Sequence, residues 1–336
     1  MSILKEILLE KKICKSVWFM RQAGRYLPEF RDIRSKNKNF IDLCLNSRLS
    51  SEITLQPIKR YNLDSAIIFS DILLVPYALG QKITFEKNQS PKLSKFNLET
   101  FLDINEDQFI NILSPVYKTI ETTRKSLNKD KSLICFIGAP WTLLVYMLNL
   151  KNSNDNLVLS KFNKANEHIQ KILRKLVKFL CVHIQNQIEA GADVVQIFDS
   201  WAGIVPESYL KDLCFNTNFE IVEFCKNKKI PNICFPKGIK DKYNEFNKFV
   251  KPDGINIDYE IDPVWARTKL RNVVIQGGLD PKILLNKEEE MIRAATKYIR
   301  TFKDIPYIFN LGHGLLPETD PVRVEKLVKF YRNFNE

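Results

Sequence analysis

Short hydrophobic runs recur along the chain and alternate with segments of helical periodicity. Eight runs rich in β-branched or aromatic residues have the length and composition of buried strands: 16–20, 64–69, 132–137, 193–198, 230–235, 254–258, 272–276 and 306–310. Most segments between them place apolar residues at helical spacing, as do Leu173, Leu176, Val177, Leu180 and Ile184. Strand and helix in alternation predict parallel strands joined by right-handed crossovers.

Eight such units predict the fold class, an α/β fold built as a single-domain (β/α)8 barrel of the TIM type with its active site at the C-terminal ends of the strands. The alternative is an open doubly wound sheet, which is less favoured because no GxGxxG motif follows the first strand. Segment 79–131 is longer than one crossover needs, so we expect an extra helix or hairpin there. No Pro-, Gly- or Ser-rich linker divides the chain, and residues 1–336 are interpreted as one catalytic domain.

Glycine is scarce, and its distribution points to one end of the predicted barrel. The chain has only 11 glycines, and most follow a predicted strand: Gly24, Gly138, Gly203, Gly238, Gly277, Gly278, Gly312 and Gly314. Glycine lets the backbone turn with positive φ or approach a ligand closely, and barrel enzymes build their sites from these loops. Tight turns after strands also use glycine, so turn geometry alone accounts for part of the pattern.

The formal net charge of +12 is compatible with nucleic acid, an anionic membrane or an acidic small substrate. Lysine is abundant along the whole chain, in segments such as LNKDKS and KNKKIP that have the composition of solvated faces. No basic face interleaved with aromatics or known binding module indicates nucleic acid. No run approaches the roughly 20 apolar residues of a membrane span, and the charged start MSILKEILLEKKICK lacks a signal-peptide core. We therefore expect a cytoplasmic protein without nucleic-acid or membrane partners.

The cysteines and histidines do not predict a metal site. Seven cysteines contain no CxxC pair and are interpreted as reduced, largely buried residues: Cys14, Cys44, Cys135, Cys181, Cys214, Cys225 and Cys234. His168, His183 and His313 are not arranged with cysteines at a ligand spacing.

The loops that follow the predicted strands mix cations, carboxylates, hydroxyls and one histidine. In order they contain Arg21 to Tyr26, Ser70-Asp71, Gly138 to Trp141, Asp199 to Gly203, Pro236-Lys237-Gly238, Asp258-Tyr259, Gly277 to Asp280, and Gly312-His313-Gly314. Such a set suits a ligand with several carboxylates, because arginine pairs with a carboxylate through two parallel hydrogen bonds.

Six long strings place the chain beside a known family. They are VWFMRQAGRYLPEFR at 17–31, DSAIIFSDILLVPYALG at 64–80, GAPWTLLVYML at 138–148, GADVVQIFDSWAG at 191–203, QGGLDP at 276–281 and FNLGHGLLPETDP at 309–321. Together they resemble the uroporphyrinogen decarboxylase family over nearly the whole chain. The resemblance implies a (β/α)8 barrel, a homodimer and a tetrapyrrole substrate. The implied reaction is the decarboxylation of the four acetate arms of uroporphyrinogen III to give coproporphyrinogen III in heme biosynthesis, with no metal or organic cofactor.

The same resemblance assigns catalytic roles to three residues. Asp71 is expected to accept hydrogen bonds from the pyrrole N–H groups and to stabilise the cation formed when the ring is protonated; by itself, Ser70-Asp71 has the composition of a helix cap. Arg21 and Arg25 are expected to bind substrate carboxylates, with one of them close enough to assist proton delivery. An isolated arginine at such a place is more often a surface ion-pair partner.

Further substrate contacts are implied for Gln22, Ala23, Gly24, Tyr146, Ser200 and His313. Outside this family pattern, Tyr146 has the alternative of a half-buried core tyrosine and Ser200 that of a helix cap. His313 alone among the histidines is bracketed by glycines after a predicted strand, whereas His168 and His183 fall on predicted helices and are interpreted as structural.

Three nearby polar residues are not assigned to chemistry. Asp199 and Asp280 are expected to orient their loops, and Lys237 is left out of the predicted site. The rival enzymatic interpretation is a methyltransferase of the same barrel type, which would need a zinc site of histidine and cysteines that the sequence does not supply.

Overall fold

The computed structural model describes residues 1–85 and 91–335, without the side chains of residues 164–167. Its main sheet has seven strands in the order β1-β4-β5-β6-β7-β8-β9, and every neighbouring pair is parallel. The strands are β1 (Ser65–Ile67), β4 (Ser132–Gly138), β5 (Val194–Asp199), β6 (Asn232–Pro236), β7 (Gly254–Ile257), β8 (Val274–Gly277) and β9 (Tyr307–Ile308). The predicted alternation of helices and parallel strands is confirmed.

The predicted first strand, residues 16–20, is only partly formed. Val17 makes an isolated parallel bridge with Phe309, just beyond β9. The Phe309 N–H donates to the carbonyl of Ser16 at 2.9 Å, and the Asp64 N–H, just before β1, donates to that of Val17 at 3.1 Å. The segment therefore contacts the chain beside both edge strands, β1 and β9, of a curled sheet without forming a regular strand itself. A turn that begins at Met20 stops it.

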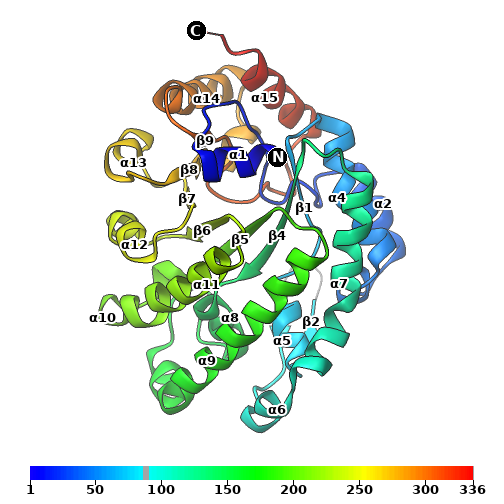
Figure 1. Ribbon diagram of the computed structural model, residues 1–336, viewed down its shortest axis with the longest axis vertical. Helices are drawn as coiled ribbons and strands as arrows, with labels where there is room; N and C mark the ends of the chain where they lie inside the picture. The colour runs from blue at the N-terminus through cyan, green and yellow to red at the C-terminus, as the bar shows by residue number, and fades with distance from the viewer. Residues whose placement is uncertain (86–90, 336) are drawn as a thin grey trace.

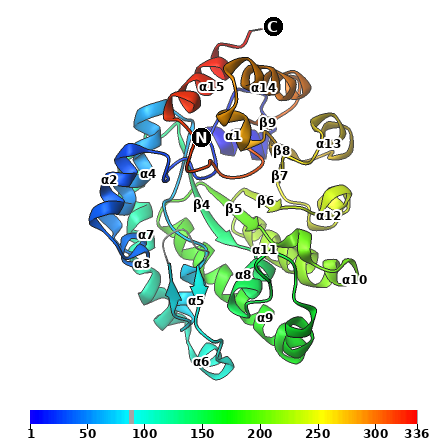
Figure 2. The ribbon, with the colours of Figure 1, turned by 180° about the vertical axis from the view of Figure 1, so that it is seen from behind.

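Helices cover the outside of the sheet all the way round (Figure 1), and the view from behind shows the same ring (Figure 2). The longer ones are α4 (Ser47–Tyr61), α7 (Glu106–Ser126), α9 (Leu159–Glu189), α11 (Asn216–Asn227), α14 (Glu288–Phe302) and α15 (Pro321–Asn333). The shorter ones are α1 (Ile3–Glu10), α2 (Pro28–Lys36), α3 (Phe40–Cys44), α5 (Leu74–Ala78), α6 (Leu98–Asp103), α8 (Pro140–Met147), α10 (Glu207–Leu210), α12 (Tyr243–Val250) and α13 (Pro263–Lys269).

Local sequence explains several helix starts. Asp262 and Asp320 each precede a proline and accept hydrogen bonds from the first-turn N–H groups of α13 and α15. An acidic cap followed by proline suits a helix start, because these N–H groups have no partner within the helix and proline has no N–H to satisfy. Asn105 and Gln108 form a reciprocal capping box at the start of α7.

The expected insertion between 79 and 131 contains both a hairpin and extra helix. β2 (Ile83–Thr84) pairs antiparallel with β3 (Lys92–Leu93), and α6 and α7 follow. Residues 86–90, between the two short strands, lie outside the described part of the chain. In Figure 1, α5, α6 and β2 extend away from the sheet at one edge of the molecule.

The interior of the curled sheet is closed at one end by α1. Its buried Leu4, Ile7 and Leu8 pack in one cluster with residues from the inner face of the sheet, among them Ile134 and Ile308. The N–H of Leu4 donates to the Ser132 hydroxyl at 2.9 Å, which fixes the helix at the N-terminal end of β4. The opposite end, where the strands finish, is therefore the end open to a ligand.

A polar layer lies above this apolar plug. The indole N–H of Trp18 donates to the Gln276 side chain at 3.0 Å, and the Gln276 amide donates to Gln196 at 3.0 Å and to Asn256 at 2.8 Å. All four side chains are fully buried. Because buried amides require partners, this network fixes the relative placement of β5, β7, β8 and the 16–20 segment.

All seven cysteines are free thiols, and five are buried, which agrees with the expected reduced state; Cys14 and Cys181 are partly exposed. Among residues 1–85 and 91–335, no helix is both long and apolar enough to cross a membrane.

Candidate active site

Electrostatic interactions link the residues that follow several different strands. Arg21 interacts with Tyr146, Asp71 and Arg25, and the charge of Arg21 also acts on His313. These side chains come from the turn after residues 16–20, the loop after β1, helix α8 after β4, and the loop after β9. The fold therefore brings the predicted catalytic residues together at the C-terminal end of the sheet.

Asp71 closes a local turn and also lies among the predicted catalytic residues. Its Oδ1 accepts a hydrogen bond from the Leu73 N–H at 2.8 Å, and its carbonyl accepts one from Leu74 at 3.2 Å at the start of α5. Burial raises the pKa of Asp71 to about 6, against the opposing effects of the Leu73 N–H and of Arg21. One carboxylate oxygen thus closes a turn just before α5, whose N-cap is Leu73 without a side-chain cap bond, and the other oxygen has no hydrogen bond with a described residue.

Arg21 adopts an unusual backbone conformation in the turn that follows the 16–20 segment. Its φ is 59°, in the left-handed region. Surrounding protein lowers the pKa of Arg21, although the side chain remains accessible to solvent; Tyr146 and Asp71 oppose that shift and Arg25 adds to it. Arg25 is also exposed. Both guanidinium groups can therefore be reached by a ligand from solvent.

Gln22 holds this turn in place through its buried side chain. Its side chain is fully buried, accepts from the Phe19 N–H at 3.0 Å and donates to the Ser65 carbonyl at 3.0 Å, so it ties the turn to β1. Its carbonyl accepts from the Tyr26 hydroxyl at 2.8 Å. The half-buried Ala23 and Gly24 lie on the turn between the two arginines. The side chain of Gln22 is thus committed to the scaffold, and so are its N–H, which donates to the Phe19 carbonyl, and its own carbonyl.

Helix α8 carries Tyr146 and also holds the loop after β5. The Trp141 indole donates to the Trp201 carbonyl at 2.8 Å, and the Trp201 N–H donates to the Thr142 hydroxyl at 3.1 Å. The rings of Tyr146 and Trp201 pack edge to face, with their centroids 6.0 Å apart. Burial raises the pKa of Tyr146, while the Trp201 indole opposes that shift. Ser200, half-buried in the same loop, makes no hydrogen bond through its hydroxyl with any described residue.

Asp199 anchors the base of this loop. Its carboxylate accepts from the Thr142 hydroxyl at 2.7 Å, the Asn218 amide at 3.0 Å and the Cys214 thiol at 3.1 Å. Asp280 caps the turn after β8 by accepting from the Lys282 N–H at 2.9 Å. The expectation that these two aspartates orient their loops is confirmed.

The three histidines lie in different settings. His313 follows β9, and burial together with the charges of Arg21 and Lys237 lowers its pKa to about 4, so it is neutral at neutral pH. His183 is buried on α9, where its Nδ1 lies 3.0 Å from the Tyr117 hydroxyl, and His168 is exposed on the same helix.

A family model described as uroporphyrinogen decarboxylase (URO-D) matches residues 10–334. The chain belongs to the uroporphyrinogen decarboxylase family. A relative named uroporphyrinogen decarboxylase from Orientia tsutsugamushi (strain Ikeda) is 42% identical over 325 residues, which cover 95% of this chain and 94% of that protein. Another of that name from Rickettsia felis is 40% identical over 323 residues, which cover 95% of this chain and 93% of its own length.

Solved structures share the fold at low sequence identity. A methyltransferase from Methanosarcina mazei superposes with a TM-score of 0.79 at 15% identity, covering 98% of this chain and 97% of its own. A B12-independent methionine synthase from Shewanella superposes with a TM-score of 0.58 at 10% identity, covering 86% and 87%. Identities this low establish a common fold and no common activity. In this member of the uroporphyrinogen decarboxylase family, the described residues contain no cluster of three or more His, Cys, Asp or Glu side chains placed to hold a metal ion.

The family strings did not single out the apolar lining of this site. Phe136 on β4 and Phe198 on β5 are partly exposed and pack against the inner cluster of the sheet, and their rings are 5.7 Å apart. Phe235 on β6 lies 6.5 Å from Phe198. Alternation along the strands could have indicated this lining. Phe136 lies two residues after Ile134 and Phe198 four after Val194, so each phenylalanine shares a strand face with a residue buried inside the sheet.

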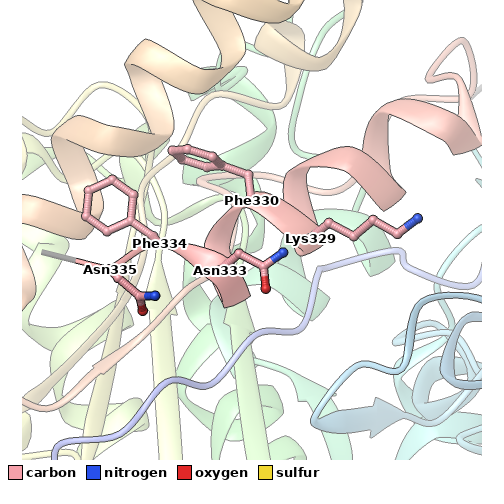
Figure 3. Close-up of a pocket in the computed structure, with 5 residues that line it drawn as sticks. All are labelled: Lys329, Phe330, Asn333, Phe334 and Asn335. Atoms are coloured by element: carbon pink, nitrogen blue, oxygen red, sulfur yellow. The ribbon is translucent and has the colours of Figure 1, made fainter.

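Two cavities lie elsewhere in this family member. One of about 440 Å³ is bounded by Lys329, Phe330, Asn333, Phe334 and Asn335 at the end of α15 (Figure 3). Another, of about 250 Å³, is near the N-terminus and is bounded by residues that include Met1, Glu6 and Lys131. None of the residues with predicted catalytic roles lines either cavity.

Proposed function

We propose that this chain is a cofactor-independent carboxy-lyase that converts uroporphyrinogen III to coproporphyrinogen III by decarboxylating its four acetate arms. Membership of the uroporphyrinogen decarboxylase family supports the reaction. The single structural observation that carries the proposal is the convergence of Asp71 and Arg21 at the open end of the sheet. A desolvated carboxylate beside an accessible guanidinium suits a substrate that is anionic at its rim and becomes cationic in its ring.

Decarboxylation leaves an electron pair that needs a sink, and the substrate can provide it. A proton adds to the pyrrole α-carbon beside an acetate arm and makes the ring cationic. The bond between the arm's methylene and its carboxyl carbon then breaks, CO2 leaves, and the electron pair neutralises the ring. Protonation of the resulting exocyclic methylene, with loss of the proton from the α-carbon, gives a methyl group. Each decarboxylation thus consumes one proton and releases one CO2.

Asp71 is the residue we assign to stabilising the cation. With a pKa of about 6 it is mostly ionised at neutral pH, and the surrounding protein shields it partly from water. A fixed charge in such surroundings stabilises developing charge more strongly than the same group in water. Its free carboxylate oxygen would accept hydrogen bonds from the pyrrole N–H groups.

Arg21 and Arg25 are assigned to the substrate carboxylates, and one of them assists the delivery of the proton. Residues 22–24 would contact the substrate between them. Tyr146 would donate a hydrogen bond to Asp71 or to an acetate, and Ser200 would donate one to a carboxylate. His313, neutral at neutral pH, can also donate a hydrogen bond to a carboxylate without adding charge.

We extend the proposal to the architecture around the site. The hydrogen bonds of Ser16 and Val17 to both ends of the sheet support a closed barrel in which residues 16–20 act as the eighth strand. We propose further that residues 1–336 form one domain, that two copies assemble as a homodimer, and that the enzyme works in the cytoplasm.

The decisive experiment is anaerobic incubation of the purified protein with uroporphyrinogen III, followed by separation of the products by number of carboxyl groups. Successive loss of the acetate carboxyls, ending at coproporphyrinogen, is the expected result. Recovery of unchanged substrate under reducing conditions would contradict the proposal. Activity should also survive exhaustive chelation, whereas a chelated, inactive protein that zinc restores would contradict independence from metal.

A further inference from the structure

We propose that Lys237 is an additional carboxylate-binding cation of this site, placed on the opposite side from Arg21 and Arg25. The inference rests on the proposed function and specifies how the far rim of the substrate is held. The sequence patterns gave this lysine no role, and the neighbouring predicted contact, Ser200 after β5, brings no positive charge to that side of the opening.

The position of Lys237 follows from the order of the strands. It comes directly after β6, the central strand of the seven, whereas the turn with Arg21 and Arg25 follows the segment that contacts the two edge strands β1 and β9. In a curled sheet the central strand lies across from the meeting edges. A ligand spanning the opening would therefore meet the two arginines on one side and Lys237 on the other.

The direction of the Lys237 side chain follows from alternation along β6. Ile233 and Phe235 belong to the cluster inside the sheet, whereas Cys234 packs in the cluster outside it. The Lys237 N–H donates to the Asp199 carbonyl at 3.1 Å, which extends the pairing of β5 with β6, and also to the Phe235 carbonyl at 3.0 Å, where the chain begins to turn. Side chains alternate between faces along a strand, and Lys237, one residue beyond β6, has the parity of Ile233 and Phe235. The interaction of its charge with His313 places the ammonium on the side of the site.

The backbone around Lys237 is held tightly. Its carbonyl accepts from the Gly203 N–H at 2.9 Å, and the Gly238 N–H donates to the Asp258 carboxylate at 2.8 Å. A Cβ on Gly203 would lie 2.7 Å from the Gly238 carbonyl oxygen, and Gly238 has a φ of 82°. Two glycines thus allow the loops after β5 and β6 to touch, which keeps the lysine at a fixed place.

Among residues 1–85 and 91–335, no carboxylate forms an ion pair with Lys237. Its ammonium has no hydrogen-bond or ion-pair partner among the described residues, and the side chain is only half-exposed. It lies close enough to His313 to act on that ring together with Arg21. Cations gathered around one opening repel each other, and a ligand with several carboxylates relieves that repulsion.

The chemistry of lysine suits this side of the substrate. Acetate and propionate arms surround the whole tetrapyrrole, so its far rim presents carboxylates wherever the arginines hold the near rim. An ammonium on a flexible stem has no fixed fork and can follow a carboxylate through a range of directions. That tolerance matches a substrate whose acetates must be presented one after another.

The test compares three variants of the whole enzyme in anaerobic turnover of uroporphyrinogen. Lys237→Gln should raise KM by about tenfold or more, because a charge-assisted hydrogen bond is lost, and should change kcat less. Lys237→Arg should stay within about threefold of wild type, since the charge is kept. The matched control is Lys240→Gln, which removes the same charge from an exposed residue of the same loop. An unchanged KM in Lys237→Gln would overturn the proposal.

A second measurement does not depend on turnover. Titration of His313 by NMR without substrate should show a higher pKa in Lys237→Gln, because a nearby positive charge has been removed, and no rise in Lys240→Gln. An unmoved His313 would place the lysine outside the site and overturn the inference. If wild type decarboxylates nothing, the proposed function fails, and binding of oxidised, unreactive uroporphyrin then decides for Lys237 alone. Weaker binding in Lys237→Gln than in Lys240→Gln supports it, and equal binding overturns it.

Discussion

Gly314 provides the space that the Arg21 side chain occupies. A Cβ built on Gly314 would lie 2.4 Å from Cδ and 2.6 Å from Cγ of Arg21, closer than real contacts allow. The guanidinium that interacts with Asp71 and Tyr146 is therefore directed partly by a missing side chain in the loop after β9.

Gly314→Ala should lower kcat/KM by about tenfold to a hundredfold, because a catalytic group displaced by about 1 Å loses its alignment. A double-mutant cycle in steady-state kinetics checks the cause: the alanine should have little further effect once Arg21 is replaced by Ala. An equally large effect in the Arg21→Ala background would mean that Gly314 acts by another route.

Asp71→Asn should reduce the single-turnover rate by about 10²–10³, because it removes the charge that offsets the ring cation. Substrate affinity should persist, since the amide keeps an oxygen that can accept. Asp71→Glu, which keeps the charge but moves it by one methylene, should fall between the two. A near-native rate in Asp71→Asn would contradict a role in catalysis and leave Asp71 only its hydrogen bond to the Leu73 N–H.

The pKa of Asp71 also predicts how stability changes with pH. Because the folded-state pKa of about 6 lies above the ordinary value of 3.8, the native protein holds a proton that the unfolded chain has released, and stability falls as pH rises between these values. Asp71→Asn keeps the acceptor for Leu73 and removes this penalty. Thermal melts should show the variant more stable than wild type at pH 7.5, with the gain lost below about pH 4. A variant less stable than wild type at pH 7.5 would contradict the conclusion that burial raises the pKa of Asp71.

Arg25→Lys and Arg21→Lys should each lose about tenfold or more in kcat/KM, because lysine keeps the charge but cannot pair with a carboxylate through two parallel hydrogen bonds. Arg48→Lys, on an exposed helical position, is the matched control and should be near wild type. Steady-state kinetics with uroporphyrinogen make the comparison. Near-normal turnover in both site variants would remove the arginines from their proposed roles.

His313→Asn should weaken turnover without abolishing it. The neutral histidine is assigned to a carboxylate contact, and asparagine can still donate a hydrogen bond. Turnover and product affinity should both be measured. A folded variant that binds the tetrapyrrole but does not react would instead place His313 in the proton transfers.

Hydrophobic patterning was sufficient to predict the strand and helix order but not the extent of each strand. The run at 16–20 has the composition of its neighbours, yet the chain turns at Met20 and Arg21, where φ is 59°. Gln22 holds this turn through a hydrogen bond to the Ser65 carbonyl on β1, and Gly314 leaves room for the Arg21 side chain. Both are tertiary contacts that local composition does not predict.

The site residues differ in how far the sequence could predict them. The sequence could not decide whether Asp71 is a helix cap or a site residue, because both roles call for a carboxylate after a strand. In the structure one oxygen accepts from the Leu73 N–H in a turn, and α5 has no side-chain cap. Lys237 gave no compositional signal, being one of 51 basic residues. Continuing the inward alternation of Ile233 and Phe235 by one more step would have singled it out.

The plug formed by α1 has a consequence for how the protein is made. Leu4, Ile7 and Leu8 leave the ribosome long before Val274 and Ile308, which belong to the cluster that receives them. Their apolar face must therefore wait, uncovered, for nearly the whole chain to be synthesised. The packing of α1 against the sheet is therefore among the last events of folding. In a nascent or truncated chain, the exposed apolar face of α1 can bind chaperones or other incompletely folded copies.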